Sequence, residues 1–457
     1  MVWFGPTRWL TLLALVTTGC ADDRDPCEYE VCDIADRECV QWIAEAVACQ
    51  REVSLVVPRV VFATAAEVVG DDVDPTPEEL KNFNDYYAGE ALVGLMPGGY
   101  DAANEAADSL SGFVAFYSGE SKEVVIISDA VSSDPEQAYS VLVHEMIHVY
   151  QDAEYDLATV FDQDATTFDR SLGLRAGIEG EATWYQLLAS LDVDGVSEPD
   201  VDWPQYFGGF QAAMFDEARD TETPTLDALG FFPYAFGSDQ AHKAWLDGGA
   251  AAVSDLVLEP ADSVRQIMAG YDARPPDAFN LDEQLSPHAV PILPGHTLLG
   301  GGYQSAWLVN AMLQRTAGAR SVWSSVLEGI AADHLSIFRN DATGESVAVW
   351  RFVEDERSTT SLRDALVLPS DSMWRLQTGE IPGDETLTHL VAELDGDTVL
   401  VATGGPGAEA LLATVTGWES PKEAQDRAGL YADYRSRSPT LWMQRALGIK
   451  GPSVIAR

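Results

Sequence analysis

The residues best placed to do chemistry in this chain are His144, Glu145 and His148, which form the pattern H-E-x-x-H. Two histidines four residues apart lie one above the other on the same face of a helix. That spacing lets two imidazoles bind one zinc ion, while the adjacent glutamate faces the open side of the metal. There Glu145 can accept a proton from water that the zinc activates. The pattern therefore predicts a zinc hydrolase centre, although so short a motif can also arise by chance.

The surrounding sequence predicts that the motif lies on a helix preceded by a β-hairpin. Ser133 stands at an N-cap position, Pro135 follows just inside the helix, and Glu136 completes a capping box. No glycine or proline interrupts the segment that follows. Upstream, residues 116–122 and the apolar run 124–127 are typical of a hairpin with a buried or edge strand. A strand followed by the motif helix is the usual setting of this chemistry.

A catalytic zinc site normally has a third protein ligand, and a second predicted helix offers two acids for it. Glu179 and Glu181 lie at the start of this helical pattern. Because residues two apart on a helix differ by about 200° of rotation, only one of them can face the metal. The other histidines do not repeat the motif spacing, and we prefer a carboxylate to any of them: His242, His288, His296, His334 and His389.

An H-E-x-x-H helix followed by a helix with E-G-x-A resembles the gluzincins, the zinc peptidases with a glutamate as third ligand, including those of the aminopeptidase N type. In that pattern the glutamate before the glycine is the ligand. The resemblance therefore implies Glu179 as the third ligand and leaves Glu181 as a solvated helix residue. Thr183, four residues after Glu179, would then hydrogen-bond a ligating histidine.

Further segments resemble a group of gluzincin-like bacterial proteins, many of them exported. Residues 148–157 resemble its H-x-x-Q-D-x-x-F-D-L run, residues 232–237 its F-P-Y-x-x-G segment, and residues 248–253 its G-G-x-x-A-V pattern. This resemblance covers residues 110–275 and implies a core of a small sheet, an active-site helix and a Glu-bearing helix. The group often has a histidine shortly after the last segment, and residues 266–268 carry none.

These features predict a zinc-dependent metallopeptidase, with zinc at His144, His148 and Glu179 and with Glu145 as general base. Glu145 would pass its proton on to the leaving amine. The oxyanion needs a further donor, and the sequence offers three candidates: Arg175, Tyr185 and Tyr234. The alternative is a non-catalytic exported binding or assembly lipoprotein on a metallopeptidase scaffold. The presence of Glu145 argues against it, because a structural site needs no general base.

The start of the chain predicts export. Arg8 precedes a short apolar run at residues 9–16, and Thr17-Thr18-Gly19-Cys20 resembles a bacterial lipobox. We expect a signal peptide at residues 1–19, lipidation of Cys20 and a lipid anchor in the cell envelope. An ordinary secretory peptide cut nearby is the alternative. The outer membrane is favoured, since Ala21 rather than aspartate follows the cysteine.

Four cysteines follow within a short stretch, which predicts two disulfides in an oxidising compartment. Three pairings are open. A zinc site made of four thiolates is the weaker alternative, because no C-x-x-C spacing occurs. Residues 38–53 are helical in pattern, so the bridges are expected to staple a small helical cap. The cysteines are Cys27, Cys32, Cys39 and Cys49.

The composition restricts the partners. A formal net charge of −47 over 457 residues argues against nucleic acid, whose phosphates would be repelled, and against charge-driven binding to anionic lipid. We therefore expect a peptide or protein substrate, with membrane contact through the N-terminal lipid. Dispersed acids are typical of a heavily hydrated surface.

The pattern of elements predicts an α+β protein with a gluzincin-like core and a mixed C-terminal extension. In the extension, residues 335–338 with 347–352 and residues 389–394 with 399–402 are typical of two hairpins, and Gly300-Gly301-Gly302 of a turn. The expected divisions are a signal peptide (1–19), a lipidated tether (20–26), a disulfide-stapled segment (27–52), a metallopeptidase-like domain (53–285) and a C-terminal α+β region (286–457).

Overall fold

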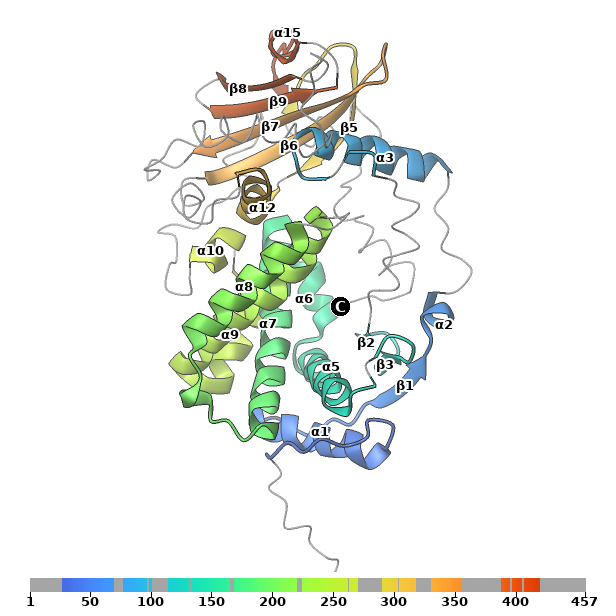
Figure 1. Ribbon diagram of the computed structural model, residues 1–457, viewed down its shortest axis with the longest axis vertical. Helices are drawn as coiled ribbons and strands as arrows, with labels where there is room; N and C mark the ends of the chain where they lie inside the picture. Colours follow the sequence, from blue (N-terminus) through green and yellow to red (C-terminus); the bar gives the residue numbers. More distant parts are fainter. Residues whose placement is uncertain are drawn as a thin grey trace, which may run out of the picture.

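The helices and strands of this computed structural model are arranged in two parts along its long axis (Figure 1). One part is mainly helical and the other is built on a larger sheet, so the predicted α+β class is confirmed. The structure describes residues 27–69, 77–96, 98–100, 114–131, 133–164, 168–219, 224–261, 263–269, 290–302, 304–317, 330–354, 388–394, 397–404 and 407–419.

The helical part contains the H-E-x-x-H segment. Its long helices pack side by side, with a small sheet on one flank and α1 across the lower end (Figure 1). Its helices are α1 (Arg37–Gln50), α2 (Ala65–Val69), α5 (Pro135–Tyr155), α6 (Leu157–Asp164), α7 (Phe168–Val193), α8 (Trp203–Arg219), α9 (Pro224–Leu258) and α10 (Val264–Ala269). Helix α9 is interrupted at Gly248 and Gly249, where the backbone leaves helical geometry.

The small sheet has the strand order β1-β3-β2. Strands β2 (Ala115–Ser118) and β3 (Glu123–Ile127) are antiparallel, which confirms the predicted hairpin, and β1 (Arg59–Ala63) runs parallel to β3. Asp152 fastens this hairpin to α5, since one of its carboxylate oxygens accepts from Tyr117 Oη at 2.7 Å and pairs with Lys122 Nζ. The hairpin is thereby held against the helix that carries the motif.

Helices α7 and α9 approach each other closely because glycines line their contact. A Cβ added at Gly180 would lie 2.3 Å from the carbonyl carbon of Gly237, and one added at Gly237 would lie 2.1 Å from Ala176 O. At Gly177, an added Cβ would lie 2.5 Å from Leu256 O. The E-G-x-A and F-P-Y-x-x-G segments thus meet in space, and their glycines are needed for that contact.

The N-terminal cysteines form two disulfides, as predicted. Cys27 pairs with Cys49 and Cys32 with Cys39, with Cα–Cα separations of 5.2 and 5.6 Å. Both bridges brace α1, which packs against α5 in a shared apolar cluster. The signal segment 1–19, Cys20 and the tether up to residue 26 lie outside the described residues.

The second part is built on a five-stranded antiparallel sheet of order β5-β6-β7-β9-β8. Both predicted hairpins are confirmed, as β6–β7 and β8–β9. Helices α3 and α12 pack with one face of the sheet, and α15 with the other. The elements are α3 (Pro77–Leu92), β4 (Val290–Pro291), β5 (His296–Gly302), α12 (Ser305–Ala317), β6 (Ile330–Asn340), β7 (Ser346–Glu354), β8 (Thr388–Leu394), β9 (Asp397–Thr403), α15 (Ala408–Leu412) and β10 (Trp418–Glu419).

The predicted turn at Gly300-Gly301-Gly302 is wrong, because these residues lie in β5, just after a bulge between Leu298 and Gly300. A Cβ added at Gly301 would lie 2.4 Å from Leu335 O of β6. The glycine at this position therefore permits close pairing of two strands rather than a reversal of the chain.

Helix α3 belongs to the N-terminal half of the sequence but packs on the C-terminal sheet. It precedes the small sheet in sequence, yet it packs on β6 and β7 and shares an apolar cluster with them (Figure 1). A Cβ added at Gly89 of α3 would lie 2.2 Å from Ile337 Cγ2 of β6. Among the described helices, none combines the length and apolar character that crossing a membrane requires.

Candidate metal centre

Helix α5 places the two motif histidines one turn apart. Pro135 opens the helix, and the side chain of Asp134 caps it by accepting from the Glu136 backbone N–H at 3.1 Å. The predicted helix is confirmed, but its cap is Asp134 rather than Ser133. His144 and His148 are both buried, and their Nε2 atoms lie 3.1 Å apart.

Helix α7 brings Glu179 to the same point. Its Oε2 lies 3.2 Å from His144 Nε2 and 3.4 Å from His148 Nε2. The side chain is 2% exposed, so this carboxylate is sequestered with the two imidazoles. The three residues that the sequence predicts as metal ligands therefore converge, although two of them come from one helix and the third from another.

The spacing of these three atoms fits a metal ion. Ligand atoms about 2.0–2.1 Å from a tetrahedral zinc ion lie roughly 3.3 Å from one another. The observed separations of 3.1, 3.2 and 3.4 Å are close to that value. His144, His148 and Glu179 thus form a group that could hold a metal ion.

The charges at the centre also favour a cation. Burial acts to raise the pKa of Glu179, but the charge of His148 and hydrogen bonds to both imidazoles lower it to about 2. Burial acts to lower the pKa of His148, and the charge of Glu179 outweighs it and raises that pKa to about 9. The ionised carboxylate therefore draws a positive charge toward the two Nε2 atoms.

A glutamine side chain contacts the Nδ1 atom of each imidazole, on the side of the ring away from the metal position. His148 Nδ1 lies 2.8 Å from Gln151 Oε1, and His144 Nδ1 lies 3.1 Å from Gln186 Oε1. An Nδ1–H that donates to an amide oxygen leaves the Nε2 lone pair facing the metal position. The predicted contact of Thr183 with a histidine is wrong, because Thr183 Oγ1 has no hydrogen bond within the described part of the chain.

Glu145 lies beside the three converging side chains and is fully buried. Among the described residues, no side chain hydrogen-bonds its carboxylate oxygens, and the backbone of Tyr117 is the one group close enough to act as a donor. Burial raises the pKa of Glu145 to about 8, and the charge of Glu179 acts in the same direction, while the charge of His148 and the backbone of Tyr117 oppose it. A buried carboxyl group to which no side chain is hydrogen-bonded is available to exchange a proton with a bound molecule.

The prediction that Glu181 is a solvated helix residue is wrong. Glu181 is 0% exposed, and its Oε1 accepts from Arg51 Nη2 at 2.7 Å and from Arg51 Nε at 3.1 Å. Its other oxygen accepts from Gln151 Nε2 at 2.8 Å. Glu181 therefore faces away from the metal position, as the choice of Glu179 requires, but toward a buried arginine rather than toward solvent.

One of the three candidate oxyanion donors, Tyr234, lies beside the centre. Its ring centroid is 5.9 Å from that of His144. Burial, followed by the charge of Glu179, raises the pKa of Tyr234, so the phenol keeps its proton and can donate it in a hydrogen bond. The charge of Arg175 opposes this shift. Tyr185 instead stacks near Arg51 on the side of Glu181.

Sequence reasoning missed three residues of this centre: Arg51, Gln151 and Gln186. Gln151 lies inside the H-x-x-Q-D run, so a signal for it was present. Gln186 lies one turn beyond Ala182 on the same helix as Glu179, and no motif in the sequence includes it. Arg51 is 130 positions away from Glu181 in sequence, and a local sequence pattern cannot predict a contact between residues so far apart.

Comparison of the chain with protein-family models, with curated proteins and with solved structures finds no match. The likeness to gluzincins therefore rests on the sequence motifs and on the site that they form.

Proposed function

We propose that this protein is a zinc-dependent metallopeptidase of the gluzincin type, exported and anchored by a lipid on Cys20. The observation that carries the proposal is Glu145, a buried carboxyl group with no side-chain partner among the described residues, beside three side chains spaced as metal ligands. A site that only held a metal would have no use for this group. The two disulfides are compatible with an exported protein.

His144, His148 and Glu179 are the residues that would hold the metal. Two imidazoles and one carboxylate are one of the ligand sets found in catalytic zinc sites, which leave a fourth position for water or substrate. When bound, zinc supplies Lewis acidity, because it polarises a carbonyl group and makes water acidic enough to react near neutral pH.

The side chains of the protein divide the remaining tasks. Glu145 accepts a proton from the attacking water and then delivers it to the leaving amine. Tyr234, kept protonated by burial and by Glu179, is the donor for the oxyanion that forms on the attacked carbonyl. Because the four central residues are buried, these charges act in a medium of low polarity, where they are stronger than in water.

The test is to measure the zinc content of the purified protein and its cleavage of a mixed peptide library, for the wild type and for Glu145→Gln. We expect zinc near one equivalent in both proteins, and peptide cleavage reduced about 10²- to 10⁴-fold in the variant, since it lacks the general base. The isosteric amide keeps the shape of the site, so equal zinc contents would exclude a loss of the metal as the cause.

Zinc binding without cleavage by the wild type would contradict the peptidase and favour the non-catalytic binding lipoprotein. Cleavage that persists in Glu145→Gln would contradict the role of Glu145. The lipid anchor is tested separately: the wild type should partition into detergent after expression in an exporting bacterium, and Cys20→Ser should not.

A further inference from the structure

We propose that Arg51 is a positioning residue for the metal ligand His148, and that it acts through Glu181 and Gln151. This inference rests on the metal site proposed above. Arg51 lies directly after α1, two residues beyond the disulfide-bonded Cys49. The disulfide-stapled segment would therefore be part of the metal centre rather than a separate cap.

The first step is the orientation of the Gln151 amide. Its Nε2 donates to Ile178 O at 2.9 Å and to Glu181 Oε2 at 2.8 Å. A backbone carbonyl and a carboxylate paired with arginine both accept hydrogen bonds, so the nitrogen of the amide must face them. The amide oxygen is therefore the atom that faces His148 Nδ1, at 2.8 Å.

The second step follows for the imidazole. An amide oxygen only accepts, so His148 Nδ1 must carry the proton of the neutral ring. In the neutral ring the lone pair is then on Nε2, the nitrogen that lies 3.4 Å from Glu179 Oε2 and 3.1 Å from His144 Nε2, where the metal would be held. Gln151 thus selects the one tautomer of His148 that can bind a metal at this point.

The third step is what holds Glu181 in place. Arg51 supplies two donors to its Oε1, from Nη2 at 2.7 Å and from Nε at 3.1 Å. The side chains of both residues are nearly or fully inaccessible to solvent, at 1% and 0% exposed. Without the guanidinium, the Glu181 carboxylate would be a buried charge with no counter-charge, which a fold relieves by moving the group or admitting water. Either change would remove one of the two acceptors that orient the Gln151 amide and would leave only Ile178 O.

Arg51 is itself fixed by its surroundings. Its backbone N–H donates to Val47 O at 2.9 Å and closes α1, and its guanidinium lies near the rings of Tyr150 and Tyr185, at 6.0 and 5.9 Å. Buried ion pairs are often no more stabilising than apolar residues of similar size. The hydrogen bonds that lead from the Arg51–Glu181 ion pair through Gln151 to His148 give this buried pair a role other than stabilising the fold.

The experiment is a zinc titration of the full-length protein in competition with a chromophoric chelator, with zinc as the only added ligand. We expect Arg51→Met to weaken zinc binding at least about tenfold, as loss of an outer partner of a ligand does. Arg51→Lys, which keeps the charge, should restore part of the affinity. Gln151→Met should weaken binding at least as much, and adding Arg51→Met to it should cost little more, because both act through one contact.

Arg351→Met is the matched control. Arg351 forms a half-buried pair with Asp397 and lies over the Trp418 ring, at 4.6 Å, in the C-terminal sheet. Its loss should lower the thermal midpoint without changing the zinc affinity. If Arg51→Met does not fold, Glu181→Gln carries the same test, since it keeps the shape of the side chain while removing its charge.

The outcomes separate the two proposals. A wild type that binds no zinc contradicts the metal site and the role of Arg51 together. A wild type that binds zinc tightly, with unchanged affinity in Arg51→Met and Glu181→Gln, overturns the role of Arg51 alone. A loss of affinity in Arg351→Met equal to that in Arg51→Met would also overturn it, because the effect would then reflect general destabilisation.

Discussion

The two imidazoles of the centre are backed by amides, whereas a carboxylate partner is common for zinc-binding histidines. Gln151 and Gln186 are neutral, so they orient the rings without adding negative charge. Glu179 is then the only one of the three ligands that carries a formal negative charge. A divalent ion would keep a net positive charge at this centre, which favours polarisation of a substrate carbonyl.

Replacing Gln186 should test this arrangement at the residue scale. Gln186 Nε2 donates to Ser140 Oγ at 2.8 Å, and its oxygen faces His144. We expect Gln186→Ala to weaken zinc binding by about 10- to 100-fold, since His144 loses the partner that fixes its ring. Competition with a chelator measures the change.

Thr183→Val is the control for that prediction. Thr183 Oγ1 is buried without a hydrogen bond among the described residues, so an isosteric apolar side chain should leave the zinc affinity unchanged. A loss of affinity in Thr183→Val, with none in Gln186→Ala, would show that the wrong residue has been assigned to His144.

The sequence predicts that His144, Glu145, His148 and Glu179 lie together because their placement follows from local spacing, and the structure brings these four side chains to one point. His144, Glu145 and His148 lie within one motif, and the residue pair Glu179-Gly180 has its own pattern. The error over Glu181 has a physical cause: a helix pattern shows that a residue turns away from the metal, but not whether solvent or a buried arginine lies there. Arg51 could not be predicted, because its contact joins segments far apart in the chain.

At the scale of elements, the site depends on how closely α7 and α9 pack. Gly180 directly follows the ligand Glu179, and Gly237 lies one turn after Tyr234. The contact between these two glycines sets the position of Tyr234 relative to the ligands. The glycines of both segments therefore serve the geometry of the centre, although neither touches it.

Gly237→Ala should separate the two helices. The new Cβ would lie 2.1 Å from Ala176 O, a backbone atom that cannot turn aside. We expect a loss of about 1–3 kcal/mol in the free energy of unfolding, as overpacking typically costs, together with lower peptidase activity. Urea denaturation measures the first effect.

Gly230→Ala provides the comparison within the same helix. Nothing lies within 4 Å of a Cβ added there, so the variant should gain up to about 1 kcal/mol from the better helix propensity of alanine. Equal losses of stability in both variants would show that the close approach at Gly237 is not what matters.

Elements with strong local signals could be predicted, and those defined by distant partners could not. The motif helix, the hairpin before it and both C-terminal hairpins are where the sequence places them. Residues adjacent in sequence make the glycines at 300–302 typical of a turn. In the structure they let β5 approach β6 closely, and β6 lies about thirty positions further along the chain. Nothing in the residues of α3 itself shows that this helix packs on the C-terminal sheet.

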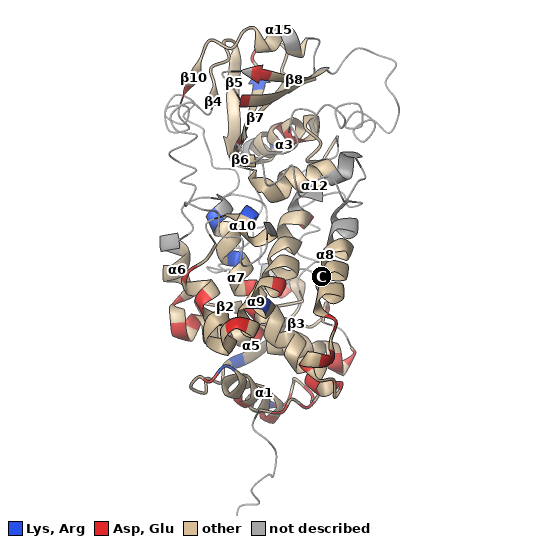
Figure 2. Ribbon diagram, turned by 90° about the vertical axis from the view of Figure 1, so that its left-hand side faces the viewer, with Lys and Arg blue, Asp and Glu red and all other residues tan. Residues whose placement is uncertain are grey.

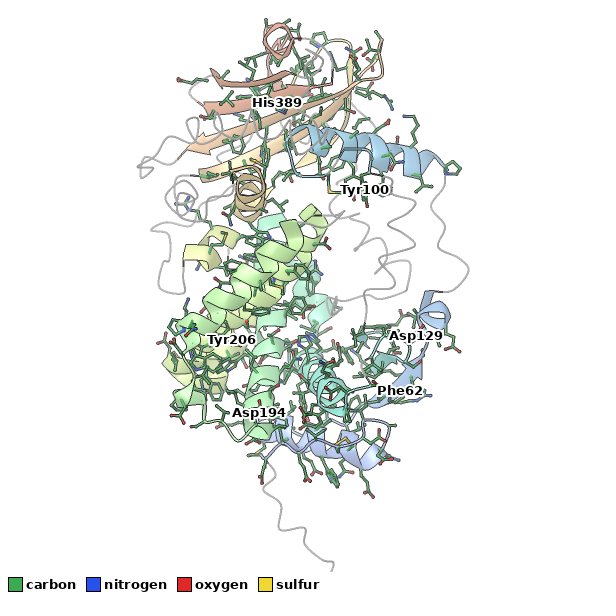
Figure 3. The ribbon with its side chains drawn as sticks, viewed as in Figure 1. Phe62, Tyr100, Asp129, Asp194, Tyr206 and His389 are labelled. Carbon is green, nitrogen blue, oxygen red and sulfur yellow. A yellow bond between two sulfur atoms is a disulfide. The ribbon has the colours of Figure 1, made fainter. Side chains whose placement is uncertain are left out.

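At the scale of the whole molecule, α3 and the C-terminal sheet are joined by polar as well as apolar contacts. Arg339 of β6 pairs with Asp85 at 2.7 Å, and the His389 ring contacts Leu92 O at the end of α3. Figure 3 shows His389 in the sheet part, beside α3. Among the described residues, the acidic side chains are spread mainly over the helical part (Figure 2).

The junction should make the fold sensitive to acid. Burial lowers the pKa of His389, although its hydrogen bond to Leu92 O acts to raise it. With a folded pKa below the unfolded value of about 6.5, the stabilisation is fully present above pH 6.5 or so and is lost as the pH falls below it. The urea midpoint of the wild type should therefore drop between about pH 7 and pH 5.

His389→Gln removes the titrating group and should flatten this part of the profile. His296→Gln, on β5 at the rim of the same sheet, should keep the pH dependence of the wild type. A profile that His389→Gln leaves unchanged would assign the acid sensitivity to other groups.

The packing of α3 on the C-terminal sheet also bears on the order in which the chain can fold as it is made. The aromatic face of α3, with Phe83, Tyr86 and Tyr87, is covered by strands that follow it by more than two hundred positions in sequence. Until those strands emerge, this face has no cover, and such exposed apolar surface promotes aggregation. A chain stopped near residue 285 would keep every residue of the metal centre and still present this uncovered helix. Expression of the helical part alone should therefore yield aggregates unless α3 is excised or its aromatic face is made polar.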